Sequence, residues 1–203
     1  MIYLADLLRN DRFGDAVSDL AGNFRVKHGL PKIHQVGLVV SDVEAAAAEL
    51  EKSGMGPFFI AAGSPVSWLE RGEQKDFQGK LGIAYHHNVE LELLEAGKGS
   101  DFYRQSLDPG GEITVQHLGF LVPDVDVWAE NLAASGYPVW VRGKLKSGPS
   151  TADFAYMDTV NDAGIVIEFI SWKMMGIRIR IPPSIYHALG RLEKLSGKRC
   201  ISL

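Results

Sequence analysis

Hydrophobic and polar positions repeat in two segments of the chain that begin 82 residues apart. The segments span residues 33–54 and 115–136, align without a gap and are identical at 8 of 22 positions. Each segment opens with a run of β-branched and other apolar residues, which is typical of a strand. An Asp then stands where a helix N-cap belongs, and a stretch of helical spacing ends at a Ser-Gly pair that stops the helix. The pattern therefore predicts a strand followed by a helix in each copy.

Further strand-like runs follow both copies of this strand–helix pair. Glycine and proline separate the runs, as is usual between strands. The pattern predicts an α+β fold built from two related strand–helix–strand–strand–strand (βαβββ) modules. The runs lie at residues 57–63 and 82–97 after the first copy, and at residues 137–143, 154–160 and 164–172 after the second.

We place the two modules at residues 31–112 and 113–172, with a helical extension at each end of the chain. Residues 1–30 show the apolar spacing of short amphipathic helices. Residues 173–203 carry seven basic side chains and one acidic side chain, a net charge of 7 − 1 = +6. A packed or dimer-contacting appendage is one interpretation of this basic tail, and a site for an anionic ligand is the alternative. One face of its predicted helix carries Ile185, Leu189, Leu192 and Leu195.

Alternation along the first strand of each module assigns the side chains to two faces. In the first module Gln35 and Gly37 lie opposite the apolar face that should pack under the helix. In the second module His117 and Gly119 take the same two places. Each glycine leaves space beside a polar side chain that can bind a metal. Matching residues of the two related strands should lie close together across a pseudo-twofold axis.

Polar side chains also interrupt the late strands of both modules. In the first module His86, Asn88, Glu90 and Glu92 share one predicted face, for which a solvated sheet surface is the alternative interpretation. In the second module Glu168 stands inside an apolar run. A lone carboxylate there is costly unless it is paired or metal-bound, and an exposed position on an edge strand is the alternative.

Four of these side chains, each from a different strand, form a candidate ligand set for one divalent cation. Oxygen ligands from Gln and Glu together with one imidazole suit Zn, Ni, Co, Mn or Mg. Two carboxylates would neutralise the cation and leave positions open for a substrate that offers two neighbouring oxygens. The set is Gln35, Glu92, His117 and Glu168.

Composition and charge narrow the choice of partners. The formal net charge of −4 supplies no basic footprint for nucleic acid. A single cysteine, Cys200, cannot form an internal disulfide, which fits a reducing compartment. No apolar run is long enough to span a membrane, and charged residues interrupt the stretch where a signal peptide would be apolar. We expect a cytoplasmic protein that binds a small molecule, with no nucleic-acid or membrane partner.

The residues around the candidate ligands resemble the vicinal oxygen chelate superfamily, which includes glyoxalase I, methylmalonyl-CoA epimerase, extradiol dioxygenases and bleomycin-resistance proteins. HQVGLVVSDVEAA and QHLGFLVPDV resemble the two module openings, and NVELELLE and GIVIEFI resemble the two ligand-bearing late strands. The resemblance spans residues 31–172 and implies a curved mixed sheet of paired βαβββ modules around one divalent metal ion. It implies the ligand set named above, and it places His34 on the other face of its strand.

The resemblance also implies a reaction class. We expect a metal-dependent isomerase, epimerase or lyase of the glyoxalase/epimerase branch. Such an enzyme would act through an enediolate on a substrate with vicinal oxygens. Glu168 is the first choice of general base, and Glu92 is the second. Glyoxalase I carries an arginine shortly before its second-module histidine, whereas this chain has Ile113 and Thr114 there. A glutathione adduct is therefore not the expected substrate. A non-catalytic binding protein of the same fold and an Fe(II)-dependent dioxygenase are the alternatives.

Several further residues are candidates for substrate binding, and a homodimer is the expected assembly. Polar candidates on the cavity side of the late strand are His86, Asn88 and Glu90. If the aromatic candidates line the cavity rather than an ordinary core, the substrate carries an apolar or aromatic body. These aromatic residues are Phe58, Phe59, Trp68, Phe154 and Tyr156.

Overall fold

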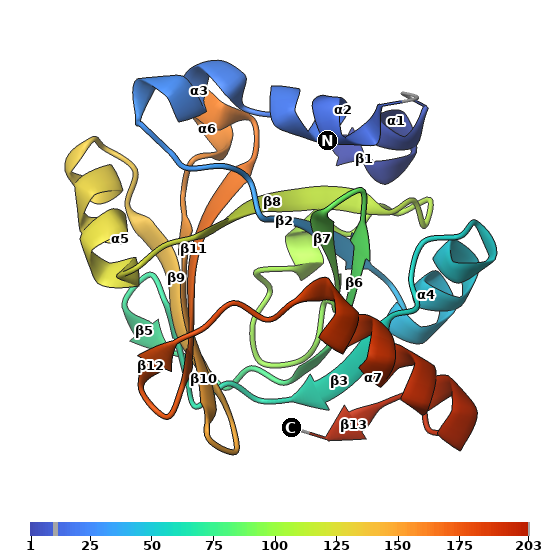
Figure 1. The fold of residues 1–203 in the computed structure, drawn as a ribbon. Helices are drawn as coiled ribbons and strands as arrows, with labels where there is room; N and C mark the ends of the chain where they lie inside the picture. The colour runs from blue at the N-terminus through green and yellow to red at the C-terminus, as the bar shows by residue number, and fades with distance from the viewer. Residues whose placement is uncertain (10–11, 203) are drawn as a thin grey trace.

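The computed structural model of the chain describes residues 1–9 and 12–202 and contains one curled, mixed sheet with helices around it (Figure 1). The strands are β1 (Ile2–Tyr3), β2 (Gln35–Val40), β3 (Phe59–Gly63), β4 (Ser67–Glu70), β5 (Glu73–Gln74), β6 (Gly79–His86), β7 (Val89–Glu95), β8 (Thr114–Leu121), β9 (Val139–Ser147), β10 (Ser150–Met157), β11 (Val166–Met174), β12 (Ile177–Arg178) and β13 (Ile201–Ser202). The helices are α1 (Leu4–Leu8), α2 (Phe13–Asp19), α3 (Gly22–Lys27), α4 (Val43–Lys52), α5 (Val125–Ala134), α6 (Val160–Ala163), α7 (Pro183–Ser196) and the 3₁₀ helix η1 (Arg104–Ser106).

The strand–helix repeat predicted from the sequence is present in both halves of the molecule. Helices α4 and α5 each have ten residues and start 82 positions apart. Asp42 caps α4 by accepting a hydrogen bond from the backbone N–H of Ala45, and Asp124 caps α5 in the same way through Asp126 and Val127. Each helix is followed by a glycine with positive φ, which a Cβ would strain. The predicted α+β fold with a curved mixed sheet is therefore confirmed.

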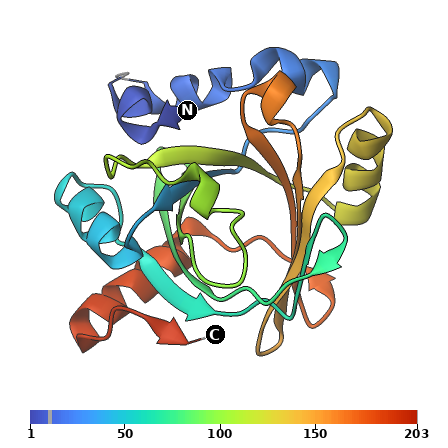
Figure 2. The ribbon, with the colours of Figure 1, turned by 180° about the vertical axis from the view of Figure 1, so that it is seen from behind.

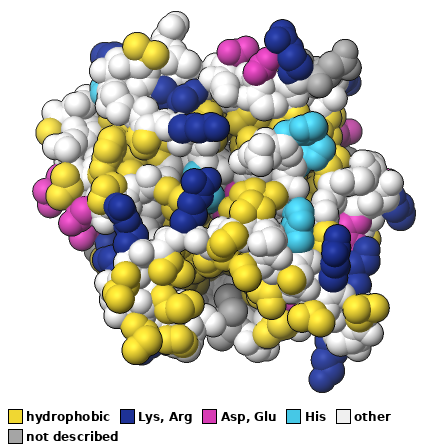
Figure 3. All heavy atoms as spheres, in the orientation of Figure 1, with side chains coloured by type: hydrophobic (Ala, Val, Ile, Leu, Met, Phe, Trp, Pro, Cys, Tyr) yellow, Lys and Arg dark blue, Asp and Glu magenta, His cyan; other side chains and the backbone are white. Residues whose placement is uncertain are grey.

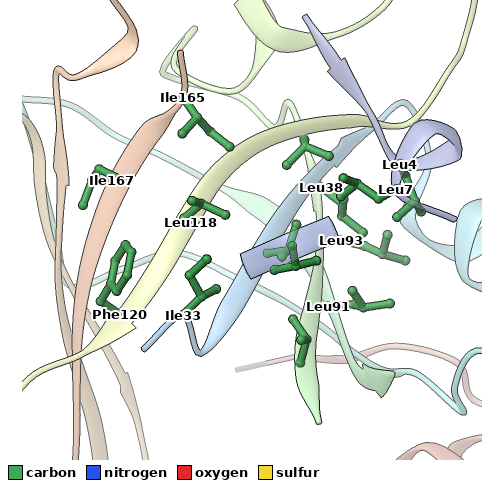
Figure 4. Packing of buried hydrophobic residues seen from close by; sticks show 14 of the residues in the cluster. Leu4, Leu7, Ile33, Leu38, Leu91, Leu93, Leu118, Phe120, Ile165 and Ile167 are labelled. Carbon is green, nitrogen blue, oxygen red and sulfur yellow. The ribbon is translucent and has the colours of Figure 1, made fainter. Parts of the chain in front are cut away.

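The first strands of the two modules lie side by side at the centre of the sheet. β2 pairs antiparallel with β8, and each also pairs in parallel with a late strand of its own module, so that the central order is β7-β2-β8-β11. The outer face of these strands is apolar and packs under the helices, as alternation predicts. Figure 4 shows this core, which includes Leu4, Leu7, Leu38, Leu91, Leu93, Leu118, Phe120 and Ile167.

The two ends of the sheet are joined by a very short connection. β3 lies near one end of the strand order and β4 near the other, yet only residues 64–66 separate them in the chain. β4 leaves the strands of its own module and pairs with β9 of the second module. The insertion of β4 and β5 was not predicted from the sequence, and it carries the chain across the opening of the curled sheet (Figure 2).

The strand expected to run through residues 85–94 is instead two strands joined by a tight turn. His87 and Asn88 form the turn between β6 and β7, both with positive φ. This conformation suits a two-residue hairpin turn because its twist matches that of the flanking strands. The turn interrupts the alternation of side chains. His86 therefore lies at the end of β6, whereas Glu90 and Glu92 lie on β7, and the predicted face that joined all three does not exist as one strand.

The C-terminal helix α7 forms as predicted, but it buries a different face. Tyr186, Gly190 and Glu193 are buried, whereas Leu192 and Leu195 are exposed. Leu192 and Leu195 of the predicted apolar face stay exposed because the helix docks through Gly190 and Glu193, a contact that apolar spacing does not reveal. Figure 3 shows exposed hydrophobic side chains on the lower half of that view, over α7 and β12. The expected homodimer stays a prediction.

The N-terminal extension forms α1, α2 and α3, which pack over the outer face of the central strands (Figure 1). The segment that contains η1 lies within the curve of the sheet, where Phe102 and Tyr103 are buried. Across residues 1–9 and 12–202, none of the helices combines the length and the apolar character needed to cross a membrane.

Candidate metal centre

The candidate ligands lie in two cross-strand rows on the concave face of the central sheet. In the first row Gly119 is flanked by Gln35 on β2 and by Glu168 on β11. In the second row Gly37 is flanked by His117 on β8 and by Glu92 on β7. Both rows place a glycine at their centre, where a side chain would fill the space between the flanking groups.

The two glycines make room for specific side chains. A Cβ on Gly37 would lie 1.8 Å from Cε1 of His117, and a Cβ on Gly119 would lie 2.5 Å from Oε1 of Gln35. Each candidate ligand from a first strand therefore lies over the glycine of the other first strand. This arrangement follows from the repeat, since Gly37 and Gly119 occupy equivalent positions.

Three of the four predicted ligands converge on one point. Ligand atoms of Glu92, His117 and Glu168 all lie within 4.8 Å of one another. His117 Nε2 is 3.1 Å from Oε2 of Glu168 and 3.6 Å from Oε2 of Glu92. Gln35 lies in the same row as Glu168, and it lines the same cavity as both glutamates.

Unsatisfied polar atoms at this point fit a metal ion. Gln35 Oε1, His117 Nε2 and Glu168 Oε2 are all buried, and none of them makes a hydrogen bond of good geometry with a described residue. Buried polar atoms without partners are rare and need an explanation. Two carboxylates, an imidazole nitrogen and an amide oxygen are suitable ligands for a divalent cation. The residues present therefore fit the group that the sequence predicts.

The imidazole of His117 is oriented by its neighbour along the chain. Nδ1 of His117 lies 2.7 Å from Oε1 of Gln116, and both side chains are buried. Because an amide oxygen only accepts, Nδ1 carries the proton in this contact. In the neutral ring Nε2 then has a free lone pair that faces the two glutamates, which is the arrangement a metal-binding histidine needs.

Gln35 is oriented by a different and more extensive set of contacts. Its Nε2 donates a hydrogen bond of 3.1 Å to Oε1 of Glu90, and the hydroxyl of Tyr85 donates to Oε2 of the same carboxylate. Nε2 of His34 lies 3.4 Å from that oxygen. With its nitrogen held by Glu90, the amide of Gln35 must direct Oε1 the other way.

The charges of the cluster shift the pKa values of its members. Burial favours the neutral acid and raises the pKa of Glu92 to about 7, with the nearby Glu168 acting in the same direction. Burial alone would lower the pKa of His117, but Glu168 and Glu92 outweigh it and raise that pKa to about 9. Without a metal the cluster therefore holds a proton on His117 at neutral pH.

A cavity of about 300 Å³ opens beside the cluster and is mostly apolar. Four of the five predicted aromatic residues line it: Phe59, Trp68, Phe154 and Tyr156. The structure places the other substrate-binding candidates elsewhere. Phe58 is fully buried in the outer core, His86 packs edge-on against Phe13, and Asn88 lies in the hairpin turn. Glu90 contacts Gln35 instead of lining the cavity, as described above.

Sequence reasoning missed several residues of the cavity wall. The hydroxyl of Tyr103 lies 2.8 Å from that of Tyr156, and both tyrosines line the cavity. Burial, together with the carboxylates of Glu92 and Glu168, raises the pKa of both. Tyr103 lies in an irregular segment without strand periodicity, so no pattern assigned it a face. Residues of α7 were missed because the tail lies outside the repeat.

Comparison with protein families gives one match that covers more than half of the chain. The model described as "Glyoxalase/Bleomycin resistance protein/Dioxygenase superfamily" matches residues 34–156. No curated protein sequence matches the chain.

Comparison with solved structures finds similarity to several proteins of low sequence identity. Methylmalonyl-CoA epimerase from Mycobacterium tuberculosis is 17% identical, with 68% of this chain and 85% of that chain covered, at a TM-score of 0.46. A variant of the Streptomyces coelicolor epimerase in complex with 2-nitronate-propionyl-CoA is 16% identical, with 74% and 99% covered, at a TM-score of 0.47. A variant of 4-hydroxymandelate synthase from Streptomyces coelicolor is 13% identical, with 82% and 56% covered, at a TM-score of 0.48.

Proposed function

The chain belongs to the glyoxalase/bleomycin resistance protein/dioxygenase superfamily, and on this premise we propose that it is a divalent-metal-dependent isomerase, epimerase or lyase. The observation that carries the proposal is the convergence of buried ligand atoms, three of them without a hydrogen bond, beside an apolar cavity. Such a combination of a concave apolar site and a few convergent polar groups is typical of a small-molecule active site.

We assign the metal to Gln35 Oε1, His117 Nε2 and the carboxylates of Glu92 and Glu168. When bound, a divalent ion supplies Lewis acidity that polarises a substrate carbonyl and its neighbouring oxygen. The proposal holds for Zn, Ni, Co, Mn or Mg. The side chains of Gln116 and Glu90 keep the two neutral ligands in the orientation that this role needs.

The reaction we propose is removal of a proton from the carbon next to that carbonyl. Glu168 is the first candidate for the base and Glu92 the second, because both carboxylates line the cavity. Burial raises the pKa of Glu92 to about 7, which makes this carboxylate a stronger base than an exposed one. Apolar walls around the carboxylates also exclude water, which would otherwise compete for the proton.

The cavity supports a substrate with two neighbouring oxygens and an apolar or aromatic body. Aromatic side chains form much of its wall. The described residues that line it include no arginine and two lysines, of which Lys80 is paired with Glu44 at 2.8 Å and Lys146 is exposed. A glutathione adduct carries carboxylates that would need cationic partners. The proposed substrate is therefore a small hydroxy-ketone or a related compound.

Exchange of a carbon-bound proton with solvent tests this function directly. The probe is 2-hydroxyacetophenone, which has a hydroxyl next to a ketone, exchangeable C–H groups and a phenyl ring. With metal-loaded protein in D₂O we expect loss of the CH₂ signal in NMR spectra, at least 100-fold faster than with metal-free protein. Glu168→Gln should remove this acceleration, because a positioned general base typically contributes a factor of about 10²–10⁴.

The matched control is Glu130→Gln, which changes an exposed carboxylate on α5 and should leave exchange unchanged. Exchange at the wild-type rate in Glu168→Gln would remove that residue from the mechanism. Metal-loaded protein that binds the probe without any exchange would instead indicate the non-catalytic binding function. Oxygen consumption by iron-loaded protein would indicate the dioxygenase alternative.

A further inference from the structure

The C-terminal helix α7 is fixed to the first module by specific contacts. A Cβ on Gly190 would lie 2.7 Å from the carbonyl oxygen of Phe58, so the helix backbone contacts the backbone that leads into β3. The carboxylate of Glu193 accepts a hydrogen bond of 2.9 Å from the N–H of Ile60. After the helix, β13 adds to the sheet in parallel with β3. The helix is therefore an integral part of the fold.

One side of this fixed helix faces the cavity. Ile185, Tyr186 and Leu189, together with Ile181 just before the helix, form part of its wall. Trp68, Phe77 and Phe154 also line this cavity, from strands and loops of both modules. The matched family model ends at residue 156, so this part of the wall comes from a segment beyond it.

Tyr186 lines the cavity next to Tyr85, whose hydroxyl donates to Glu90, the carboxylate that holds Gln35. The ring of Tyr186 is 4% exposed and packs against Tyr85 and Phe59. The carboxylates of Glu90 and Glu92 add to the effect of burial in raising the pKa of Tyr186, so the hydroxyl stays protonated and can donate. Among the described residues this hydroxyl makes no hydrogen bond, which leaves it free to donate to a molecule in the cavity.

We propose that α7 is the substrate-selecting wall of this enzyme: Leu189 and Ile185 contact the apolar body of the substrate, and the Tyr186 hydroxyl donates a hydrogen bond to an oxygen of its metal-binding end. This inference rests on the proposed function and adds the substrate class to it. The substrate is a neutral hydroxy-ketone whose body is a phenyl ring or an aliphatic group of similar size. A neutral substrate fits because two carboxylates line the cavity, while one of its two described lysines, Lys80, is paired with Glu44 and the other, Lys146, is exposed.

Two probes with the same oxygens separate the two parts of the proposal. Hydroxyacetone has a methyl group where 2-hydroxyacetophenone has a phenyl ring. Binding of each to metal-loaded, full-length protein is measured by titration calorimetry. Leu189→Trp fills the space for the ring, so we expect at least a tenfold loss of affinity for 2-hydroxyacetophenone and less than a twofold change for hydroxyacetone. Tyr186→Phe should weaken both probes by a similar factor of about 3–10, since one hydrogen bond is lost in each complex.

The matched control is Leu192→Trp, three residues further along α7, where the side chain is 61% exposed. It should bind both probes like the wild type. If Leu189→Trp unfolds, Ile185→Ala provides the second variant and should weaken only the phenyl probe, by about threefold, because it removes apolar contact. Metal content is measured in every variant and should not change.

Three results would overturn the inference. The first is an unchanged affinity of Leu189→Trp for 2-hydroxyacetophenone, and the second is an equal loss of affinity for both probes in that variant. The third is that the wild type does not bind 2-hydroxyacetophenone. A wild-type protein that catalyses exchange but shows either of the first two results keeps the proposed function and loses the role of α7. Failure of the protein to bind any metal would contradict the proposed function. Binding of the two probes to the metal-free wild type and its α7 variants would then still test whether α7 contacts the apolar body of the ligand.

Discussion

The two halves of the metal centre are related by the repeat, yet each orients its neutral ligand in a different way. In the second module His117 is oriented by Gln116, its neighbour on the same strand. In the first module Gln35 is oriented by Glu90 on the adjacent strand β7, and Glu90 in turn accepts from Tyr85. The difference follows from the chemistry of the ligands. An imidazole that donates through Nδ1 has only Nε2 left to bind a metal, whereas an amide can turn over and present nitrogen instead of oxygen.

This comparison shows why equivalent positions of a duplicated fold need not be interchangeable. The backbone places Gln35 over Gly119 and His117 over Gly37 in the same way. The surrounding side chains have diverged to suit one ligand type on each side. We expect changes in the two halves to affect metal binding unequally.

The largest expected effect comes from adding a methyl group under each ligand. Gly37→Ala should lower metal affinity at least 100-fold, because its Cβ would overlap the rigid ring of His117. Gly119→Ala should cost less, because the end of the Gln35 side chain can turn aside. Metal affinity is measured by competition with a chromophoric chelator, and each variant's Tm controls for folding. An equal loss in both variants, or a larger loss in Gly119→Ala, would contradict this comparison.

A smaller effect is expected from removing the carboxylate that holds Gln35. Glu90→Leu should lower metal affinity about 10–100-fold, the usual cost of losing an outer-shell partner. In that background Gln35→Glu should restore most of the affinity, because a carboxylate presents oxygen in either orientation. A role of Glu90 in packing alone would give no recovery, and that result would refute the orienting role.

The effect of pH on metal binding is graded, and it is smaller than the effect of either substitution when compared over one pH unit. The metal must displace the proton that His117 holds up to a pH of about 9, so affinity should rise about tenfold per pH unit from pH 7 to 9 and level off above that. Below pH 7 the dependence should steepen, because Glu92, with its pKa raised to about 7, must also lose a proton. Calorimetry in buffers of different ionisation enthalpy measures the protons released. Binding that is independent of pH between 7 and 9 would show that His117 is not a ligand.

The same shift sets the pH dependence of stability in metal-free protein. The pKa of His117 is raised on folding, so its stabilising contribution is complete below the unfolded value of about 6.5 and is lost as pH rises through about 9. We expect the Tm of metal-free protein to fall between pH 7 and 10, as measured by calorimetry. In His117→Gln this part of the fall should be absent. A wild-type Tm that is constant over the range would contradict the charged pair between His117 and the glutamates.

Much of the fold was predictable because the repeat fixes local structure twice. Asp42 and Asp124 mark the start of both helices, and the alternation in QVGLVV and HLGFLV assigns the inner and outer faces of β2 and β8. The same alternation placed Gln35 and His117 on one face. Their proximity to Glu92 and Glu168 then follows from strand order, which the resemblance to a known family supplied.

The remaining features depend on contacts that periodicity does not encode. The turn at His87 and Asn88 has no glycine to mark it, and it looks like part of a strand. The buried face of α7 is set by the close approach of Gly190 to Phe58 and by the hydrogen bond of Glu193, and both are long-range contacts. The role of Glu90 in orienting Gln35 likewise requires knowledge of which strands are adjacent.

The measurement that tests the central claim most directly is the metal content of the purified chain. After incubation with Zn, Ni, Co, Mn or Mg and removal of free ions, elemental analysis should find one divalent ion per chain with at least one of these metals. His117→Ala and Glu92→Ala should bind less than a tenth as much under the same conditions, while remaining folded. Failure of the wild type to retain any of the five metals, or full retention by His117→Ala, would contradict the account.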